Sequence, residues 1–143
     1  KNEKDLKINT LSGLKKYEKK IITSRKNFSN FLKSKNIPAM VGYGASATST
    51  TLIYNYDLSS KLTYLVDDFI AKFELFSPGT AIKVFNSKVI YKNKPEYILI
   101  LAWRYSKKII QKNIKYLKNG GKFILPLPNP KVIDKKNYKN LIR

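Results

Sequence analysis

Two glycines and two acids in this chain have the types and the spacing that could bind a ligand. The run 42–47 has the pattern G-x-G-x-x-A, with Gly42 and Gly44 as the glycines and Ala47 as the third small residue. In such a strand–turn–helix unit the glycines permit the bend and a close backbone approach, and the free N–H groups of the helix face an anion. A tight connection without a ligand has the same pattern, so both interpretations stand.

The acids Asp67 and Asp68 come at the end of a second apolar segment, 61–66. An acid about 20–25 residues after the glycines is where a ribose hydroxyl is held in dinucleotide-binding folds. A solvated strand end is the alternative, since Asp is common in turns. Because the two acids are adjacent, their carboxylates should point to opposite faces of the sheet and cannot act as a catalytic pair.

A third group follows the most apolar segment, 97–101. Trp103 is either part of the core or a platform for a ligand, and Arg104 beside it suits a phosphate or a carboxylate. Ligands of parallel sheets bind beyond the carboxyl ends of the strands, so the three groups should share one edge. The predicted ligand-binding residues are Gly42, Tyr43, Gly44, Ala45, Ser46, Asp67, Asp68, Trp103 and Arg104.

The composition excludes several kinds of chemistry. The 143 residues include no cysteine and no histidine, which rules out disulfides, thiol nucleophiles, histidine bases and Cys/His metal sites. No cluster of oxygen ligands is evident either, so no metal site is expected. The ordinary pKa of a tyrosine, about 10, favours a hydrogen-bonding or packing role for Tyr43 over acid–base catalysis. We therefore predict no catalytic residue.

The net charge of +20 is distributed unevenly. Residues 1–36 carry +8, residues 37–101 only +1, and residues 102–143 carry +11, so the predicted site is near neutral. Only three of the 29 basic residues are arginines, and no motif of interleaved aromatics and arginines accompanies the lysines, so nucleic acid is not an expected partner. No segment approaches the roughly 18 apolar residues of a membrane span, and no signal peptide is evident. We expect a cytoplasmic protein without membrane contact.

The elements that must position these residues alternate between helix and strand. Apolar residues recur at steps of three and four over 10–35, which predicts a long amphipathic helix with lysines on its other faces. This helix either packs on one face of the sheet or connects the domain to a preceding one. Further helices are expected over 46–56, 87–92 and 105–118, and strands over 37–41, 61–66, 81–84, 97–101 and 122–125.

This alternation predicts an α/β fold: a Rossmann-like three-layer sandwich with a mostly parallel sheet, preceded by the long amphipathic N-terminal helix. We divide the chain into a basic connector helix that packs on the domain, 1–36, one Rossmann-like domain, 37–133, and a basic tail, 134–143, that is expected to fray. Pro78-Gly79 predicts a type II turn, and the prolines of 126–130 forbid further central strand pairing.

With these residues in view, the chain resembles the C-terminal domain of bacterial sugar C-methyltransferases, which depend on S-adenosylmethionine. The resemblance covers roughly residues 37–133 and rests on blocks that keep the order and spacing of that family. The blocks are Val41-Gly42-Tyr43-Gly44-Ala45-Ser46-Ala47 with Thr51-Leu52, then Leu65-Val66-Asp67-Asp68, Ser77-Pro78-Gly79-Thr80, residues 97–104 and residues 120–128.

The resemblance implies a three-part enzyme with a cysteine-rich zinc module, a central methyltransferase domain that binds S-adenosylmethionine, and this Rossmann-like third domain. Such enzymes methylate a carbon of a nucleotide-linked keto-sugar through an enolate. The third domain would turn its strand-end rim to the catalytic domain, on the same or a separate chain, and help to hold the nucleotide sugar. Alone, this domain is expected to bind no cofactor and to be inactive, contributing substrate binding and domain packing.

The chain departs from the family pattern in two places. Ser46-Ala47-Thr48-Ser49 stands where many relatives have Pro-Ala-Lys-Gly, which removes a lysine from the anion-facing turn, and Phe69-Ile70 stands where Asn-Pro is frequent. Two other classes of function stay open. One is a standalone module that binds a nucleotide or S-adenosylmethionine itself, and the other is a domain that binds an anionic polymer through its lysine faces.

Overall fold

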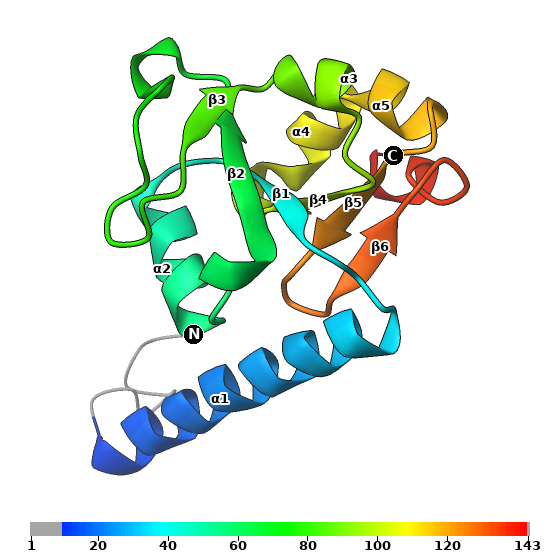
Figure 1. Ribbon diagram of the computed structural model, residues 1–143. Helices are drawn as coiled ribbons and strands as arrows, with labels where there is room; N and C mark the ends of the chain where they lie inside the picture. The colour runs from blue at the N-terminus through cyan, green and yellow to red at the C-terminus, as the bar shows by residue number, and fades with distance from the viewer. Residues whose placement is uncertain (1–9, 143) are drawn as a thin grey trace.

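The protein is described here by a computed structural model that covers residues 10–142 (Figure 1). The first nine residues of the predicted segment 1–36 and Arg143 of the predicted tail lie outside the described residues. Within residues 10–142, six strands form one sheet in the order β3-β2-β1-β4-β5-β6, in which all neighbours are parallel except β5 and β6. The strands are β1 (Met40–Tyr43), β2 (Leu62–Asp67), β3 (Val84–Asn86), β4 (Tyr97–Ile100), β5 (Lys122–Leu125) and β6 (Lys131–Ile133).

Helices cover both faces of the sheet (Figure 1). One face packs against α1 and α2, and the other against α3, α4, α5 and α6. This arrangement confirms the predicted α/β fold with its three layers, its mostly parallel sheet and its long N-terminal helix. The helices are α1 (Leu11–Ser34), α2 (Ala47–Asn55), α3 (Val89–Asn93), α4 (Ser106–Lys112), α5 (Ile114–Lys118) and α6 (Lys139–Ile142), with short 3-10 helices η1 (Ser59–Lys61), η2 (Ile70–Lys72) and η3 (Trp103–Tyr105).

The central strand β4 shows why the sequence forms this sheet. Its side chains alternate between the two cores: Leu99 packs on the α1–α2 side, while Ile98 and Ile100 pack on the other side. All three are fully buried. A parallel strand covered on both faces is continuously apolar for this reason, and the run 97–101 has that composition.

The predicted helix 105–118 is broken in the middle. Asn113 stands between α4 and α5 with a φ of −113°, outside the helical range. Its buried side chain donates from Nδ2 to the carbonyl of Ile109 at 2.8 Å and, more weakly, to the hydroxyl of Tyr43 at 3.4 Å. An asparagine that bonds to nearby backbone competes with helix continuation, which accounts for the interruption.

The C-terminal segment packs on the domain instead of fraying as predicted. Residues 131–133 form the edge strand β6, which the sequence analysis did not predict and which runs antiparallel to β5. Beyond it, Tyr138 is buried in the core of the second face, and Leu141 packs against the same core. The apolar side chains among the lysines therefore fix this tail. The predicted strand 81–84 is likewise displaced, to β3 at 84–86.

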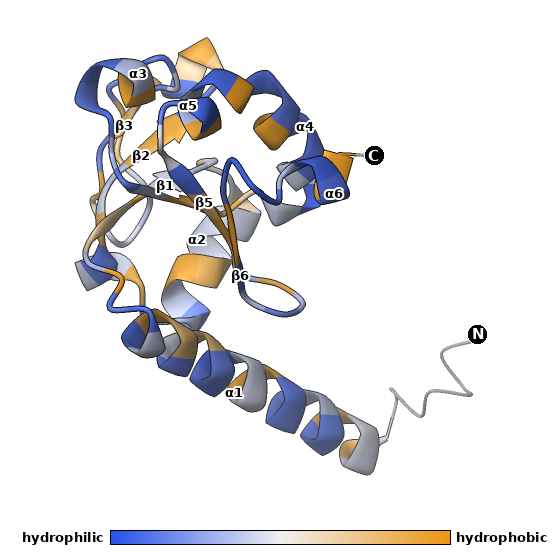
Figure 2. Ribbon diagram, turned by 90° about the vertical axis from the view of Figure 1, so that its right-hand side faces the viewer, coloured by the Kyte–Doolittle hydropathy of each residue, from blue (hydrophilic) through white to orange (hydrophobic). Residues whose placement is uncertain are grey.

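The long helix α1 packs on the domain by its C-terminal part alone. Phe28 and Leu32 are its buried residues, and they lie in the core beside α2. The N-terminal half extends away from the domain (Figures 1 and 2). Among the helices within residues 10–142, none combines the length and the apolar character needed to cross a membrane.

Candidate functional site

The two glycines of the turn are required by packing and by backbone geometry. Gly42 lies inside β1, where a Cβ would stand 2.5 Å from Leu65 Cδ2 and 2.7 Å from Leu101 Cδ1. Gly44 makes the bend with a φ of +104°, and a Cβ there would stand 2.7 Å from Ala102 Cβ. The glycines therefore make room for other residues of the chain itself, namely Leu65, Leu101 and Ala102.

Only the second half of the turn reaches the surface. Tyr43 and Gly44 are buried, Ala45 is half-buried and Ser46 is exposed. Ser46 is the N-cap of α2, and its Oγ accepts the N–H of Ser49 at 3.3 Å. Of the five turn residues predicted to bind a ligand, only Ala45 and Ser46 are thus accessible to one.

The carboxylate of Asp67 accepts a hydrogen bond from the backbone of the glycine turn. Its Oδ2 accepts the N–H of Ala45 at 2.7 Å and pairs with Lys72 Nζ at 3.0 Å. Its Oδ1 accepts the N–H of Phe69 at 2.9 Å, and the side chain is only 13% exposed. The N–H of Ala45 is therefore taken by a carboxylate of the chain itself and is not open to a ligand.

Asp68 points to the opposite face of the sheet, as the adjacency of the two acids predicts. It accepts hydrogen bonds from the hydroxyls of Tyr43 and Ser87, and its Oδ1 lies 2.6 Å from Lys112 Nζ. Partial burial raises the pKa of Asp68, but the hydrogen bonds from Lys112 and Ser87 outweigh burial and leave the pKa below its ordinary value. The two carboxylates thus serve two separate environments.

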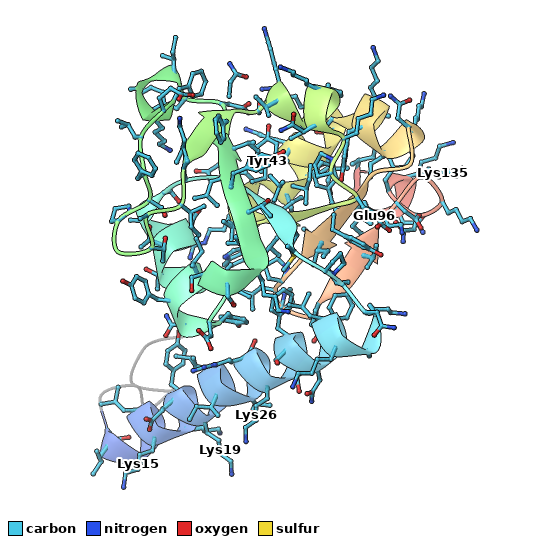
Figure 3. All side chains as sticks on the ribbon, viewed as in Figure 1. Lys15, Lys19, Lys26, Tyr43, Glu96 and Lys135 are labelled. Atoms are coloured by element: carbon cyan, nitrogen blue, oxygen red, sulfur yellow. The ribbon has the colours of Figure 1, made fainter. Side chains whose placement is uncertain are left out.

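Tyr43 joins this second environment to the core (Figure 3). Its ring is buried, its hydroxyl donates to the Asp68 carboxylate at 3.1 Å, and the buried Asn113 donates to that hydroxyl. Asn113 Oδ1 in turn accepts from the hydroxyl of Tyr91 at 2.9 Å. Burial raises the pKa of Tyr43, so the phenol stays protonated at neutral pH and acts here as a structural donor.

A cavity of about 430 Å³ opens beside the turn, on the α2 side of the sheet. Its size is in the range of pockets that take small molecules. One wall is the turn with the start of α2, and the facing wall is the irregular segment between β2 and β3. The lining residues are Ala45, Ser46, Ala47, Ser49, Thr50, Leu65, Lys72, Leu75, Phe76, Ser77, Pro78 and Val84. We name this cavity the turn pocket.

Trp103 and Arg104 follow β4 in η3 and lie outside the turn pocket. The guanidinium of Arg104 lies over the Trp103 ring, 5.3 Å from its centroid. The half-buried Trp103 lines a second cavity of about 350 Å³, between α1 and α2. The structure thus separates the nine predicted residues. Ala45 and Ser46 line the turn pocket, with Asp67 bonded to the turn beside them, while Gly42 and Gly44 are buried. Trp103 lines the other cavity with Arg104 next to it, and Tyr43 and Asp68 belong to the network on the opposite face.

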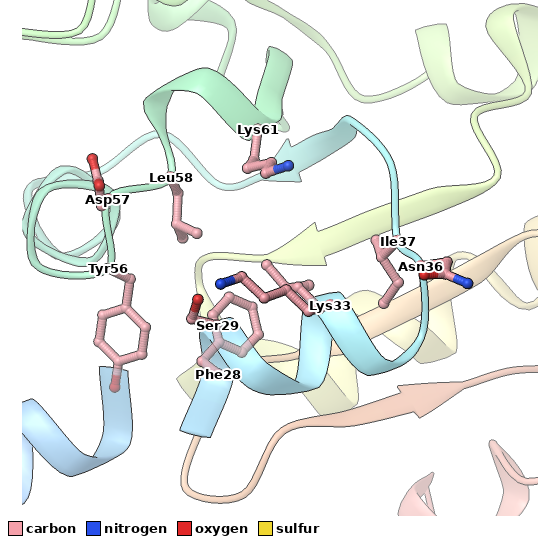
Figure 4. Close-up of a pocket in the computed structure, with 10 residues that line it drawn as sticks. Phe28, Ser29, Lys33, Asn36, Ile37, Tyr56, Asp57, Leu58 and Lys61 are labelled. Atoms are coloured by element: carbon pink, nitrogen blue, oxygen red, sulfur yellow. The ribbon is translucent and has the colours of Figure 1, made fainter. Parts of the chain in front are cut away.

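Another cavity, of about 320 Å³, lies under the C-terminal end of α1 (Figure 4). It is bordered by Ile37, just before β1, and by Lys61, just before β2. It therefore stands at the amino ends of the strands. Ligands of open α/β sheets bind at the carboxyl ends, so the turn pocket is the stronger candidate site.

The residues that form the outer wall of the turn pocket were not predicted from the sequence. Lys72, Leu75 and Phe76 line that wall. Leu75 and Phe76, together with Phe69 and Ile70 of the same segment, are 56–76% exposed although all four are large and apolar. The segment 69–76 shows no helix or strand period. Its high apolar content without a period was the one signal that could have identified it as a surface with a partner.

The strand order and the pocket define the class of the protein. The sheet order reverses between β1 and β4, the glycine turn follows β1, and the candidate cavity lies at the carboxyl ends of the strands. These features are those of a Rossmann-like α/β domain. Within residues 10–142 no cluster of acidic side chains could hold a metal ion.

The chain belongs to the C-methyltransferase C-terminal domain family, whose family model matches residues 1–128. A curated relative is the C-methyltransferase NovU of Streptomyces niveus, which is 33% identical over 95 residues. That match covers 66% of this chain but only 23% of the relative, so the chain spans about a quarter of the length of that protein.

Among solved structures, UDP-D-quinovosamine 4-dehydrogenase from Vibrio fischeri is similar at a TM-score of 0.48 and 15% sequence identity. The match covers 71% of this chain and 97% of that one.

Proposed function

We propose that this chain is the part of an S-adenosylmethionine-dependent C-methyltransferase that holds a nucleotide-linked sugar and packs against the catalytic domain. The observation that carries the proposal is the turn pocket, at the carboxyl ends of the strands in a member of this family. The methyl donor would be bound by the preceding methyltransferase domain, on the same chain or a separate one, and this domain would bind no cofactor itself.

The lining of the turn pocket suits the nucleoside end of such a substrate. Leu75, Phe76 and Pro78 offer apolar surface to the face of a base, and the hydroxyl of Ser46 lies on the opposite wall. Because Asp67 already accepts the N–H of Ala45, the diphosphate would lie away from the turn. Lys72 lines the pocket, and Arg104 follows β4 at the carboxyl edge of the sheet. Arg104 suits a phosphate because its guanidinium donates two parallel hydrogen bonds.

Neither Tyr43 nor Asp67, the two titratable residues bonded at the glycine turn, is poised for acid–base catalysis, which supports a binding role. Tyr43 has a raised pKa and is fully engaged in hydrogen bonds, and Asp67 is held by backbone and by Lys72. We therefore expect the isolated chain to have no methyltransferase activity, and we expect the exposed apolar segment 69–76 to be covered by the catalytic domain.

The test is a titration of the ¹⁵N-labelled chain with a dTDP-linked sugar, up to millimolar concentration, followed by amide chemical shifts. We expect shifts at Ala45, Ser46, Lys72 and Phe76, and weaker binding in Phe76→Ala. The matched control is Phe69→Ala, because Phe69 is equally exposed on the same segment but does not line the pocket. If the pocket amides do not move, direct substrate binding by this domain is wrong.

The same protein should be titrated calorimetrically with S-adenosylmethionine. Little or no heat is expected, because the donor belongs to the other domain in this proposal. Binding of the donor to the chain by itself would favour the alternative of a standalone module for S-adenosylmethionine.

A further inference from the structure

The N-terminal half of α1 carries a row of large apolar side chains that no part of the described chain covers. We name this row the α1 stripe; it consists of Leu11, Leu14, Tyr17 and Ile21, which are 38–70% exposed. We propose that the α1 stripe is the docking surface for the methyltransferase domain of the same enzyme, through an apolar patch edged with carboxylates. The inference rests on the proposed function for the existence of that domain, and it concerns a surface separate from the turn pocket.

The stripe continues a face that is already used for packing. With 3.6 residues per turn, Tyr17, Ile21, Phe28 and Leu32 lie on one side of the helix. The last two are 1% and 7% exposed because they enter the core beside α2. One apolar face is thus covered at its C-terminal end and bare at its N-terminal end. Most of the stability of a helix in a protein comes from packing of its apolar face, so we expect the uncovered half of α1 to pack against a second surface.

The stripe leads into a cavity that a partner side chain could fill. Tyr17 and Ile21 form one wall of the Trp103 cavity, and Leu52 of α2 with Leu127 lies across from them. The cavity holds about 350 Å³ and is open to solvent beside the stripe. A flat helix face with an adjoining apolar hollow has the form of an interface with an anchoring pocket.

The charge around the stripe selects the kind of partner. Lysines cover the rest of the helix circumference, among them Lys15, Lys19 and Lys26 (Figure 3), and Glu18 is the one acid of α1. A second copy would bring two lysine-rich helices together, which costs free energy through repulsion of like charges. A partner with carboxylates around its apolar patch gains from the same charges. The rest of the enzyme is available as that partner, since the relative NovU is about four times as long as the matched region.

A zero-length carbodiimide cross-linker, which joins an amine to a carboxylate in contact, tests the identity of the partner in the whole enzyme. We expect mass spectrometry to find Lys20, which lines the Trp103 cavity beside Tyr17 and Ile21, joined to acids of the methyltransferase domain. Links only to a second copy, detected between isotopically mixed chains, overturn the proposal. Absence of any link from Lys20 to the methyltransferase domain also overturns it.

Hydrogen exchange in the whole enzyme tests whether the stripe itself makes the contact. We expect the amides of residues 11–22 to exchange at least about tenfold faster in the double variant Leu14→Ser/Tyr17→Ser than in the wild type, because a covering surface is lost. Lys19→Ala, on the opposite side of the helix, is the matched control and should leave the rate unchanged. The amides of α2 report that each variant is folded.

The outcomes separate this inference from the proposed function. Unchanged exchange in the double variant, with sugar binding at the turn pocket intact, overturns the docking surface and leaves the proposed function standing. Faster exchange in a protein whose turn pocket binds no nucleotide sugar overturns substrate binding by this domain and supports the docking surface.

Discussion

Two adjacent carboxylates, Asp67 and Asp68, lead to two regions of the molecule that differ in almost every property. On the α2 side, Asp67 closes the glycine turn with two backbone N–H groups and Lys72, and a cavity of about 430 Å³ opens next to it. On the α4 side, Asp68 belongs to a continuous network with Tyr43 and Asn113, which leaves the strand ends filled with side chains.

One edge of a sheet can therefore carry a ligand-binding region on one face and a structural network on the other. The pleat sends neighbouring side chains to opposite faces, so each face receives one acid at the same strand end. On the α4 side the polar side chains hydrogen-bond to one another, so this side contributes to the stability of the fold. The α2 side leaves apolar surface and a lysine facing a cavity, so that side is where a ligand would bind. Substitutions at Gly44, Asp67, Tyr43 and Asp68 test this division.

Gly44 lies where β1 bends at the edge shared by the two sides, so we expect its substitution to lower the free energy of unfolding the most. Gly44→Ala places an alanine at a φ of +104° and a Cβ 2.7 Å from Ala102 Cβ, which should lower the free energy of unfolding by about 3 kcal/mol. Gly120→Ala is the matched control: its φ is +95°, but a Cβ there meets nothing within 4 Å, so strain alone should cost about 1 kcal/mol. Urea unfolding measures both. Equal losses would contradict the role given to the contact with Ala102.

Asp67→Asn tests the α2 side. The amide cannot accept from all the donors that now meet the carboxylate, so we expect the free energy of unfolding to fall by about 2 kcal/mol. Asp57→Asn is the control, because Asp57 is 78% exposed and lies 3.8 Å from Arg25. Thermal unfolding followed by circular dichroism compares the two. A loss no larger than that of the control would show that Asp67 is free to serve a ligand.

Tyr43→Phe tests the α4 side at its buried centre. Removing the hydroxyl takes a donor from Asp68 and an acceptor from Asn113, which keeps its bond to the carbonyl of Ile109. We expect a loss of about 1 kcal/mol in the free energy of unfolding. In the nucleotide-sugar titration this variant should bind like the wild type. Weaker binding would break the division between a binding face and a structural face.

The pH dependence of Asp68→Asn should give the smallest effect. The pKa of Asp68 is lowered in the folded state, so its stabilising contribution is fully present above the unfolded pKa of about 4 and is lost as the pH falls through the folded pKa. The difference in unfolding free energy between wild type and variant should be below about 1 kcal/mol at pH 7, because Asp68 is 43% exposed, and it should vanish in acid. A difference that grows on acidification would contradict this assignment.

Much of the fold could be predicted from local patterns. The continuously apolar run 97–101 predicted the central strand, and Pro78-Gly79 predicted a turn in which Gly79 has a φ of +72°. The edge strand 131–133 was not predicted, because three residues after several prolines are too few to show a strand pattern. The helix break at Asn113 was not predicted, because a single asparagine inside a helical period does not reveal that its side chain bonds to the carbonyl of Ile109.

The candidate site was predicted only in part. The turn and the two acids were placed at the same edge, and the opposite directions of Asp67 and Asp68 follow from their adjacency alone. The outer wall of the turn pocket was missed, because the segment 69–76 has no period and its position relative to Ser46 is set by contacts between remote parts of the chain. The separation of Trp103 into another cavity was missed for the same reason.

The alternation of helix and strand, the parallel sheet and the family follow from the sequence alone, because they depend on periodicity and on short blocks of residues. The partner of the Ala45 N–H and the half of α1 that is covered depend instead on tertiary contacts. A carboxylate bonds to whichever donors come within about 3 Å of it. Those donors belong to segments whose separation in space no local pattern encodes.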